Sequence, residues 1–340
     1  MVRFIMIEVE HLSKIYGSTT AIEDVTFAVE RGEILGFLGP NGAGKTTTMR
    51  ILTGYLPATS GTAKVAGFEV HEDSLAVRRQ IGYLPETPPL YPEMTVEGFL
   101  HFVARIKGVS AGDRDRQVES AMNRCGLIEK RTTLIRKLSK GYKQRVGIAQ
   151  AIVHDPPAII LDEPTVGLDP RQIIEVRNLI KSLAGDHTVI LSTHILPEVS
   201  MTCSRVAIIN RGRIVATNTP ENLMTQLSEA SSYELEVDAN TGEAETELIS
   251  SIKGLAGVKQ VERLASNLPE HRFKLRVTTE QGAESVGRAI AATVVGAGLG
   301  LEEMRRTQAS LEDVFLQLTT EEAPVETDTE SQTETTGEAA

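Results

Sequence analysis

Short apolar runs separated by turn residues dominate residues 5–86 and predict a series of strands. The predicted strands are Ile5–Val9, Val25–Val29, Ile34–Leu38, Thr62–Val65 and Ile81–Leu84. Two other segments, 45–54 and 74–80, space their apolar residues as helices do. Strands and helices therefore alternate in this part of the chain, which is typical of an α/β fold.

From about residue 95 to 154 the pattern becomes helical and has few β-branched runs, which predicts a helical insert. Strand and helix patterns then alternate again. The predicted strands are Ala158–Leu161, Thr188–Ser192, Val206–Asn210 and Ile214–Ala216, and the predicted helices are Arg171–Leu183, Pro197–Cys203 and Pro220–Leu227. Strands separated by helices imply a parallel sheet covered on both faces.

The pattern changes after Ser228, and we expect a small α+β domain at about 232–319. Its predicted strands are Tyr233–Val237, Val258–Leu264, Arg272–Thr278 and Gly300–Arg305, and its predicted helices are Glu243–Lys253, Ala283–Val295 and Ser310–Leu318. The first domain is expected to span residues 5–228.

The chain has 340 residues and a formal net charge of −11, but the charge is uneven. Residues 321–340 hold seven acids and no Lys or Arg, so removing their seven negative charges leaves −4 for the other 320 residues. A net charge so close to zero on these residues does not indicate an overall basic surface, so no nucleic-acid partner is expected. The Thr- and Glu-rich end, 320–340, is predicted to be a disordered acidic tail.

Apolar stretches are too short to cross a bilayer as a helix, and the N-terminal apolar segment is too short for a signal peptide. The two cysteines, Cys125 and Cys203, cannot build a disulfide framework. These features favour a cytoplasmic location.

The segment from Gly39 to Thr46 fits the phosphate-loop pattern G-x-x-x-x-G-K-[ST] between a predicted strand and a predicted helix. Glycines allow several backbone N–H groups to face one anion, and the helix dipole adds to the attraction. Lys45 is expected to reach the β- and γ-phosphates, and Thr46 to bind Mg²⁺. The residues expected to contact the nucleotide here are Gly39, Pro40, Asn41, Gly42, Ala43, Gly44, Lys45, Thr46 and Thr47. A Gly-rich turn without a ligand is the alternative.

Two adjacent carboxylates, Asp162 and Glu163, follow the apolar strand Ala158–Leu161. Ligands of open α/β sheets bind at the carboxyl ends of the strands, so Asp162 is placed to hold Mg²⁺. Glu163 points elsewhere and can act as the general base for the attacking water. A capping or turn role is the alternative for such a pair.

Further motifs follow in a fixed order along the chain. They are Tyr16 in the segment Leu12–Gly17, the signature-like segment Leu138–Tyr142, the loop Val166–Asp169, and Ser192–His194. With the phosphate loop and Glu163, residues 5–228 resemble the ATP-binding subunit of an ABC transporter. The resemblance implies a P-loop NTPase fold, with a RecA-like core, an antiparallel β subdomain and a helical insert at about 87–154, plus the small α+β C-terminal domain.

The resemblance also implies a mechanism in which two subunits pair head to tail and enclose ATP and Mg²⁺. The phosphate loop of one subunit would face Ser139, Lys140, Gly141, Tyr142 and Asp169 of the other. Glu163 and His194 would be the catalytic residues; Thr46, Glu86 and Asp162 would bind the metal; and Tyr16 would stack on adenine. Ordinary packing of Tyr16, and a strand-end role for His194, are the alternatives.

Two positions depart from the family pattern. Glu86 stands where the family usually has Gln; a carboxylate can still bind Mg²⁺. Lys140 and Tyr142 replace Gly and Gln in the signature, whereas Ser139 and Gly141 remain. Lys140 either adds a cation to the opposing ATP site or is solvated.

The small C-terminal domain resembles an accessory domain of bacterial export subunits, and the ending Ser310–Phe315 recurs in that subgroup. The implied partners are a membrane permease of the ABC-2 type and a second ATP-binding subunit, with a homodimer favoured over a heterodimer. The subunit would then sit on the inner face of the membrane. The segment Thr87–Met94, with Leu90, Tyr91 and Met94, is the candidate contact with the permease; packing on its own domain is the alternative.

Two other functions compete with transport. A soluble ABC ATPase acting on ribosomes or DNA is disfavoured, because the chain has one phosphate loop and Asp162 follows Lys45 by only 117 positions. A nucleotide-gated module that does not hydrolyse ATP is disfavoured by the presence of Glu163 and His194.

Overall fold

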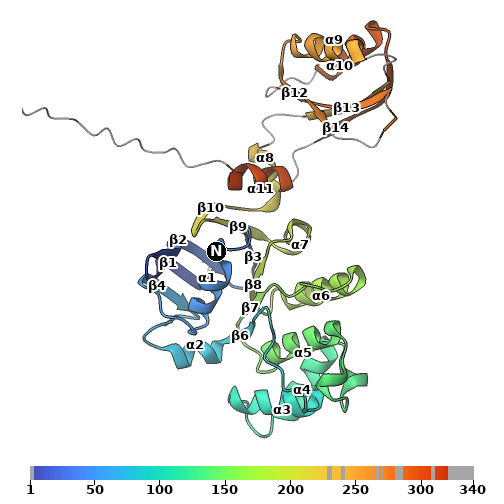
Figure 1. Ribbon diagram of the computed structural model, residues 1–340. Helices are drawn as coiled ribbons and strands as arrows, with labels where there is room; N and C mark the ends of the chain where they lie inside the picture. The colour runs from blue at the N-terminus through green and yellow to red at the C-terminus, as the bar shows by residue number, and fades with distance from the viewer. Residues whose placement is uncertain are drawn as a thin grey trace, which may run out of the picture.

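The computed structural model describes residues 4–227, 232–238, 242–264, 268–269, 271–279, 286–307 and 311–320 (Figure 1). Apart from Thr320, the predicted acidic tail lies outside the described residues, as do residues 283–285 of one predicted helix. The strands of the described residues form three sheets. None of the helices in the described ranges is both long enough and apolar enough to span a membrane.

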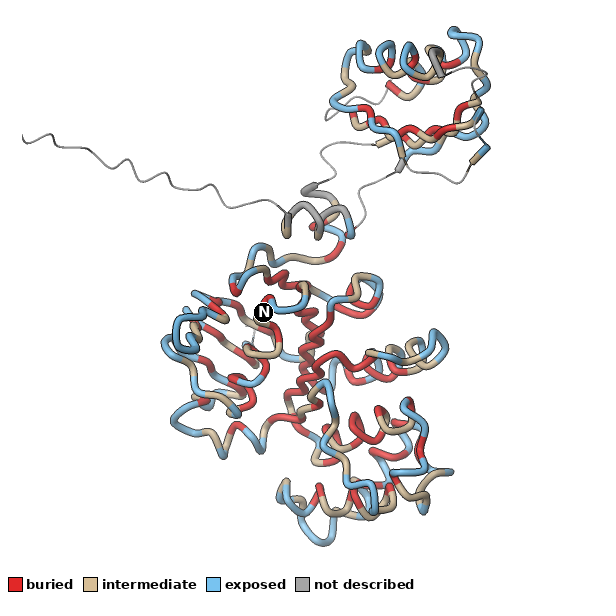
Figure 2. The backbone as a smooth tube through the Cα atoms, in the orientation of Figure 1, coloured by how far each residue is buried: buried red, intermediate tan, exposed pale blue. Residues whose placement is uncertain are grey.

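The central sheet has the order β10-β9-β3-β8-β7-β6. Its strands are β3 (Ile34–Leu38), β6 (Ile81–Leu84), β7 (Ala158–Asp162), β8 (Thr188–Thr193), β9 (Arg205–Asn210) and β10 (Arg213–Asn218). All neighbours pair in parallel except β10, which pairs antiparallel with β9. Every residue of β3, β7 and β8 is buried, and the buried tube in Figure 2 follows these central strands. Such two-sided burial explains why these strands are almost continuously apolar.

Alternate residues of β3 enter different cores, which shows that both faces of the sheet are covered. Ile34 and Leu38 belong to the core shared with the helices, whereas Leu35 and Phe37 belong to the core under the antiparallel sheet. The helices beside the central strands are α1 (Lys45–Leu52), α6 (Pro170–Leu183), α7 (Leu196–Thr202) and α8 (Pro220–Leu227). The predicted covered parallel sheet is confirmed, although one of its faces is covered largely by a second sheet.

That second sheet has the order β2-β1-β4-β5 and is antiparallel. Its strands are β1 (Ile5–Tyr16), β2 (Thr19–Glu30), β4 (Ser60–Val65) and β5 (Phe68–Glu69), and α2 (Ser74–Gln80) follows. The strands β1 and β2 are longer than predicted. Backbone pairing continues through their polar ends to the hairpin, where Tyr16 pairs with Thr19 around Gly17.

The helical insert contains α3 (Val96–Ile106), α4 (Arg114–Arg124) and α5 (Lys140–Ile152), with short 3₁₀ turns η1 (Ile128–Lys130) and η2 (Ile135–Lys137). The side chain of Thr95 caps α3 by accepting a hydrogen bond from Gly98 N. Apolar residues of the insert, including Phe99 and Val146, continue the core that packs on the central sheet. The insert is therefore anchored to the first domain by a shared core.

The C-terminal part forms its own sheet, β12-β13-β11-β14, and its own apolar core. Its elements are β11 (Ser232–Asp238), α9 (Gly242–Lys253), β12 (Val258–Leu264), β13 (Arg272–Thr279), α10 (Val286–Gly296) and β14 (Gly300–Thr307). Side chains alternate along β11: Leu235 is buried, whereas Glu234 forms ion pairs with Arg276 and Arg305. This part has the α+β composition expected from the sequence.

The last helix, α11 (Leu311–Thr320), packs on the first domain rather than on this sheet. Leu311, Phe315 and Leu318 join the core that includes Leu223 of α8. Asn210 Nδ2 at the end of β9 also donates a hydrogen bond to Thr319 O at 3.3 Å. The range expected for the small domain, 232–319, thus includes a helix whose apolar stripe packs on the first domain instead.

Candidate functional site

The phosphate loop joins β3 to α1, and glycine is required in it for two physical reasons. Gly42 and Gly44 have φ of 81° and 105°, in the left-handed region that favours glycine. A Cβ atom on Gly44 would lie 2.5 Å from Ile22 Cγ2, and one on Gly39 would lie 2.8 Å from Ile209 Cγ2. The sequence pattern therefore matches a tight backbone path between β2, β9 and α1.

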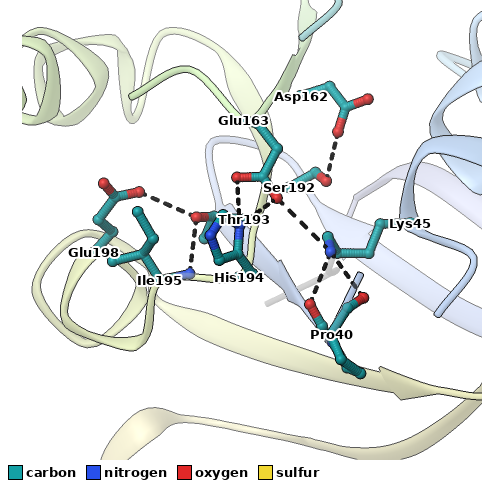
Figure 3. Close-up of polar contacts among 10 residues, drawn as sticks. Pro40, Lys45, Asp162, Glu163, Ser192, Thr193, His194, Ile195 and Glu198 are labelled. Carbon is teal, nitrogen blue, oxygen red and sulfur yellow. Dashed lines mark hydrogen bonds and ion pairs between the residues drawn. The ribbon is translucent and has the colours of Figure 1, made fainter. Parts of the chain in front are cut away.

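Lys45 begins α1 and turns its ammonium back over the loop. Its Nζ donates hydrogen bonds to Gly39 O at 2.8 Å and Pro40 O at 3.1 Å, and lies 3.7 Å from Glu163 Oε1 (Figure 3). Burial lowers the pKa of Lys45, while the charges of Glu163 and Asp162 oppose that shift. A cation held by neutral carbonyls beside carboxylates can exchange those partners for phosphate oxygens.

Asp162 ends β7 with a fully buried side chain. Its Oδ1 accepts a hydrogen bond from Ser192 Oγ of the neighbouring β8 at 2.7 Å, but its Oδ2 is buried and has no hydrogen-bond partner among the residues that the structure describes. A buried carboxylate oxygen without a partner is unfavourable, which suits a site that receives a cation or its bound water. The donor set of Asp162, Thr46 and Glu86 is all oxygen, as Mg²⁺ prefers.

Glu163 and His194 are in direct contact although they lie 31 positions apart in the sequence. Nδ1 of His194 lies 2.9 Å from Glu163 Oε1 and 3.0 Å from Oε2, so Nδ1 carries the proton and donates (Figure 3). The Glu163 side chain is buried, while 43% of the His194 side chain is exposed. Glu163 also has φ of 50°, an uncommon conformation for a non-glycine residue and one that clusters at functional sites.

A cavity of about 450 Å³ lies over the phosphate loop and brings predicted residues from four segments together. The predicted residues that line it are Asn41, Gly42, Gly44, Lys45, Thr46, Thr47, Glu86, Glu163 and His194. Gly39 and Pro40 do not line the cavity, but their carbonyl oxygens accept hydrogen bonds from Lys45. The cavity therefore combines backbone donors, one ammonium, two carboxylates and an imidazole, which is a set suited to binding and cleaving a polyphosphate.

The remaining predicted residues do not line this cavity. Tyr16 is 46% exposed at the end of β1, with Lys14 Nζ 5.2 Å from the centre of its ring. Ser139 caps α5, its hydroxyl accepting a hydrogen bond from Tyr142 N, and Asp169 caps α6 in the same way through Gln172 N. Both caps lie at helix N-termini, which attract anions.

Two departures from the family signature have contacts within this chain. Two cations lie near the ring of Tyr142, with Lys130 Nζ at 5.4 Å and Arg145 Cζ at 5.9 Å from its centre, and the ring packs against the insert core. Lys140 lies against Gly167 and does not line the phosphate cavity. Gly141 faces the side chain of Gln172 so closely that a Cβ atom would collide with it.

Some residues of the site were not predicted from the sequence. Ala21 and Val166 line the cavity, and Ser192 holds Asp162. Ser192 and Val166 belong to motifs that the sequence analysis recognised, so adjacent residues of those motifs were the only indication that these two lie at the site. Ala21 has no polar side-chain group, and it lines the cavity only because of the path of β2.

Comparisons with known proteins agree with this geometry. A family model described as ABC transporter matches residues 22–166. The linearmycin resistance ATP-binding protein LnrL of Bacillus subtilis (strain 168) is 31% identical over 316 residues, covering 92% of this chain and 98% of that protein. The Nod factor export ATP-binding protein I of Ralstonia nicotianae is 30% identical, covering 92% and 94% respectively.

A solved structure of an ATP-binding subunit of an ABC transporter superposes with a TM-score of 0.60 at 34% identity. The match covers 65% of this chain and 93% of that structure, so the shared part corresponds in extent to the first domain. Since a relative above 30% identity is matched over nearly its whole length, the chain belongs to the ABC transporter family, as an ATP-hydrolysing subunit that powers transport.

Proposed function

We propose that this subunit forms a homodimer on the cytoplasmic face of a membrane and powers an export permease of the ABC-2 type. Relatives named for linearmycin resistance, bacitracin transport and Nod factor export support an export role. The observation that carries the coupling to a permease is that the phosphate cavity adjoins a second groove, with Glu86 and Val166 lining both.

The proposed roles follow from the contacts around the phosphate cavity. The phosphate loop and Lys45 bind the triphosphate, Glu163 accepts the proton of the attacking water, and His194 holds Glu163 in position. Thr46, Glu86 and Asp162 would hold Mg²⁺, which neutralises charge on the phosphates when bound. Tyr16 supplies a face for adenine. Ser139, Lys140, Gly141, Tyr142 and Asp169 face the nucleotide of the partner subunit.

The second groove, which we call the β6–α5 groove, has a volume of about 460 Å³. One wall is the segment after β6, with Glu86, Pro88 and Leu90; the other contains Arg136 of η2 and two lysines of α5, Lys140 and Lys143. Its mixture of apolar and basic side chains suits a short permease helix that carries an acidic residue.

The sequence-based candidate for this contact was the cluster Leu90, Tyr91 and Met94. Of these, Leu90 lines the groove, whereas the ring of Tyr91 packs on Phe99 and Phe102 at centroid distances of 6.0 and 5.4 Å. Met94 packs against the insert core. Part of the cluster therefore stabilises its own domain, and the groove contact falls to Leu90 and the basic residues.

Membrane retention tests this proposal. We expect Lys143→Glu to reduce co-sedimentation with membranes that contain a co-expressed partner permease by about tenfold, because one charge reversal replaces attraction with repulsion. ATP binding is measured alongside, since Lys143 does not line the phosphate cavity. Lys64→Glu, on β4 and outside the groove, is the control. Equal retention of the parent and Lys143→Glu proteins would contradict the proposed docking site.

Glu86 has a separate expected effect, because it lines both the cavity and the groove. Glu86→Ala should lower the permease-stimulated ATPase rate by about tenfold or more, since the shared carboxylate contact is lost. Glu86→Gln should retain most of the stimulation, because the amide keeps one oxygen in place. The measurement is phosphate release with and without permease; full stimulation of Glu86→Ala would remove Glu86 from the coupling path.

A further inference from the structure

Glu198 is a buried carboxylate that does not line the phosphate cavity. It lies in the first turn of α7, is 4% exposed, and its Oε2 accepts a hydrogen bond from Thr193 Oγ1 at 3.2 Å. Its Oε1 is buried, and no described residue forms a hydrogen bond with it. A carboxylate buried with one such bond is unfavourable for the fold alone, so its contacts are informative.

The hydrogen bond between Thr193 and Glu198 connects Glu198 to the segment that carries His194. The Thr193 hydroxyl that donates to Glu198 also accepts a hydrogen bond from Ile195 N at 3.1 Å. The residues on both sides of His194 are thus joined through one hydroxyl, which Glu198 orients (Figure 3). Since the peptide N–H of Ile195 directly follows His194, this chain fixes the backbone from which the imidazole reaches Glu163.

Burial raises the pKa of Glu198, and the hydroxyls of Thr165 and Thr193 oppose that rise. The hydrogen bond from Thr193 therefore ties this buried carboxylate to the segment that carries His194.

We propose that Glu198 is a positioning residue for ATP hydrolysis, which holds the His194 segment in place through Thr193. The inference rests on the proposed roles of Glu163 and His194.

Steady-state ATPase kinetics of the full chain test this role. Glu198→Ala is expected to lower kcat at least about tenfold and to leave the KM for ATP within about twofold, because Glu198 does not touch the nucleotide cavity. Glu198→Gln should recover most of the rate, since its amide oxygen can accept the Thr193 bond. Glu97→Ala, an acid in the first turn of α3, is the matched control and should keep the parent kcat.

A second pair of variants removes the same bond from the other side, in case Glu198→Ala folds poorly. Thr193→Val should lower kcat as Glu198→Ala does, whereas Thr193→Ser keeps the hydroxyl and the rate. A parent-like kcat in both Glu198→Ala and Thr193→Val would overturn the proposal. So would a loss of rate accompanied by an equal loss of ATP affinity.

The double variant Glu198→Ala/His194→Ala separates this inference from the function on which it rests. If Glu198 acts through His194, the double variant has the kcat of His194→Ala within about twofold. Multiplied losses would overturn the inference but leave the role of His194 intact. If His194→Ala alone kept the parent rate, the proposed role of His194 would be wrong, and the inference would fall with it.

Discussion

Glu163→Gln is expected to lower the ATP hydrolysis rate by at least about 100-fold, because an amide cannot accept the proton of the attacking water. The change should leave ATP bound. Gln keeps the size of the side chain and an oxygen for the hydrogen bond from His194 Nδ1, which lies 2.9 Å from Glu163 Oε1. It also removes one negative charge from a cavity that must hold a triphosphate, so ATP should bind at least as tightly as in the parent protein.

The measurements are phosphate release under single-turnover conditions and the oligomeric state by size-exclusion chromatography with ATP and Mg²⁺. We expect the Glu163→Gln protein to elute as a stable dimer with bound ATP, because the nucleotide that joins the two subunits is not cleaved. Glu129→Gln, an exposed carboxyl-to-amide change on η1, should hydrolyse ATP at the parent rate. Parent-like hydrolysis by Glu163→Gln would assign the general base to another group.

The sequence predicted most of the phosphate cavity because its chemistry is concentrated in contiguous motifs. Gly39–Thr46 requires glycines at particular backbone angles, and Asp162 and Glu163 follow an apolar strand, so local pattern and function coincide. The parallel pairing of β3, β7 and β8 then brings these strand ends together at one edge of the sheet.

What the sequence did not predict depends on contacts between distant segments. Glu198 is one more acid in a helix until the fold brings it into hydrogen-bond contact with Thr193. The helix α11 follows the small domain in sequence, yet its apolar stripe packs against Leu223 of the first domain. Apolar periodicity shows that a face is buried but not which element buries it, so domain membership could not be derived from pattern alone.

Lys45→Ala is expected to affect an earlier step than Glu163→Gln, by weakening ATP binding itself. Lys45 Nζ makes two hydrogen bonds to the loop carbonyls of Gly39 and Pro40, at 2.8 and 3.1 Å, that phosphate oxygens can replace. Charge-assisted hydrogen bonds contribute about 1.5–3 kcal/mol each, so two of them correspond to a loss of affinity of about 100-fold or more. Without Lys45, the nearest cation that offsets the repulsion between the triphosphate and the carboxylates of Asp162 and Glu163 is also lost.

Isothermal titration with ATP and Mg²⁺ measures this effect directly, and Lys64→Ala on β4 controls for the loss of a lysine from the surface. An ATP Kd for Lys45→Ala within about threefold of the parent value would contradict the proposed role of Lys45. The two variants together separate binding from chemistry. Lys45→Ala should give no ATP-dependent dimer at a nucleotide concentration that saturates the parent, whereas Glu163→Gln should give a dimer that persists. Because Lys45 Nζ and Glu163 Oε1 are only 3.7 Å apart, opposite outcomes would show that the two charges act at different steps within one cavity.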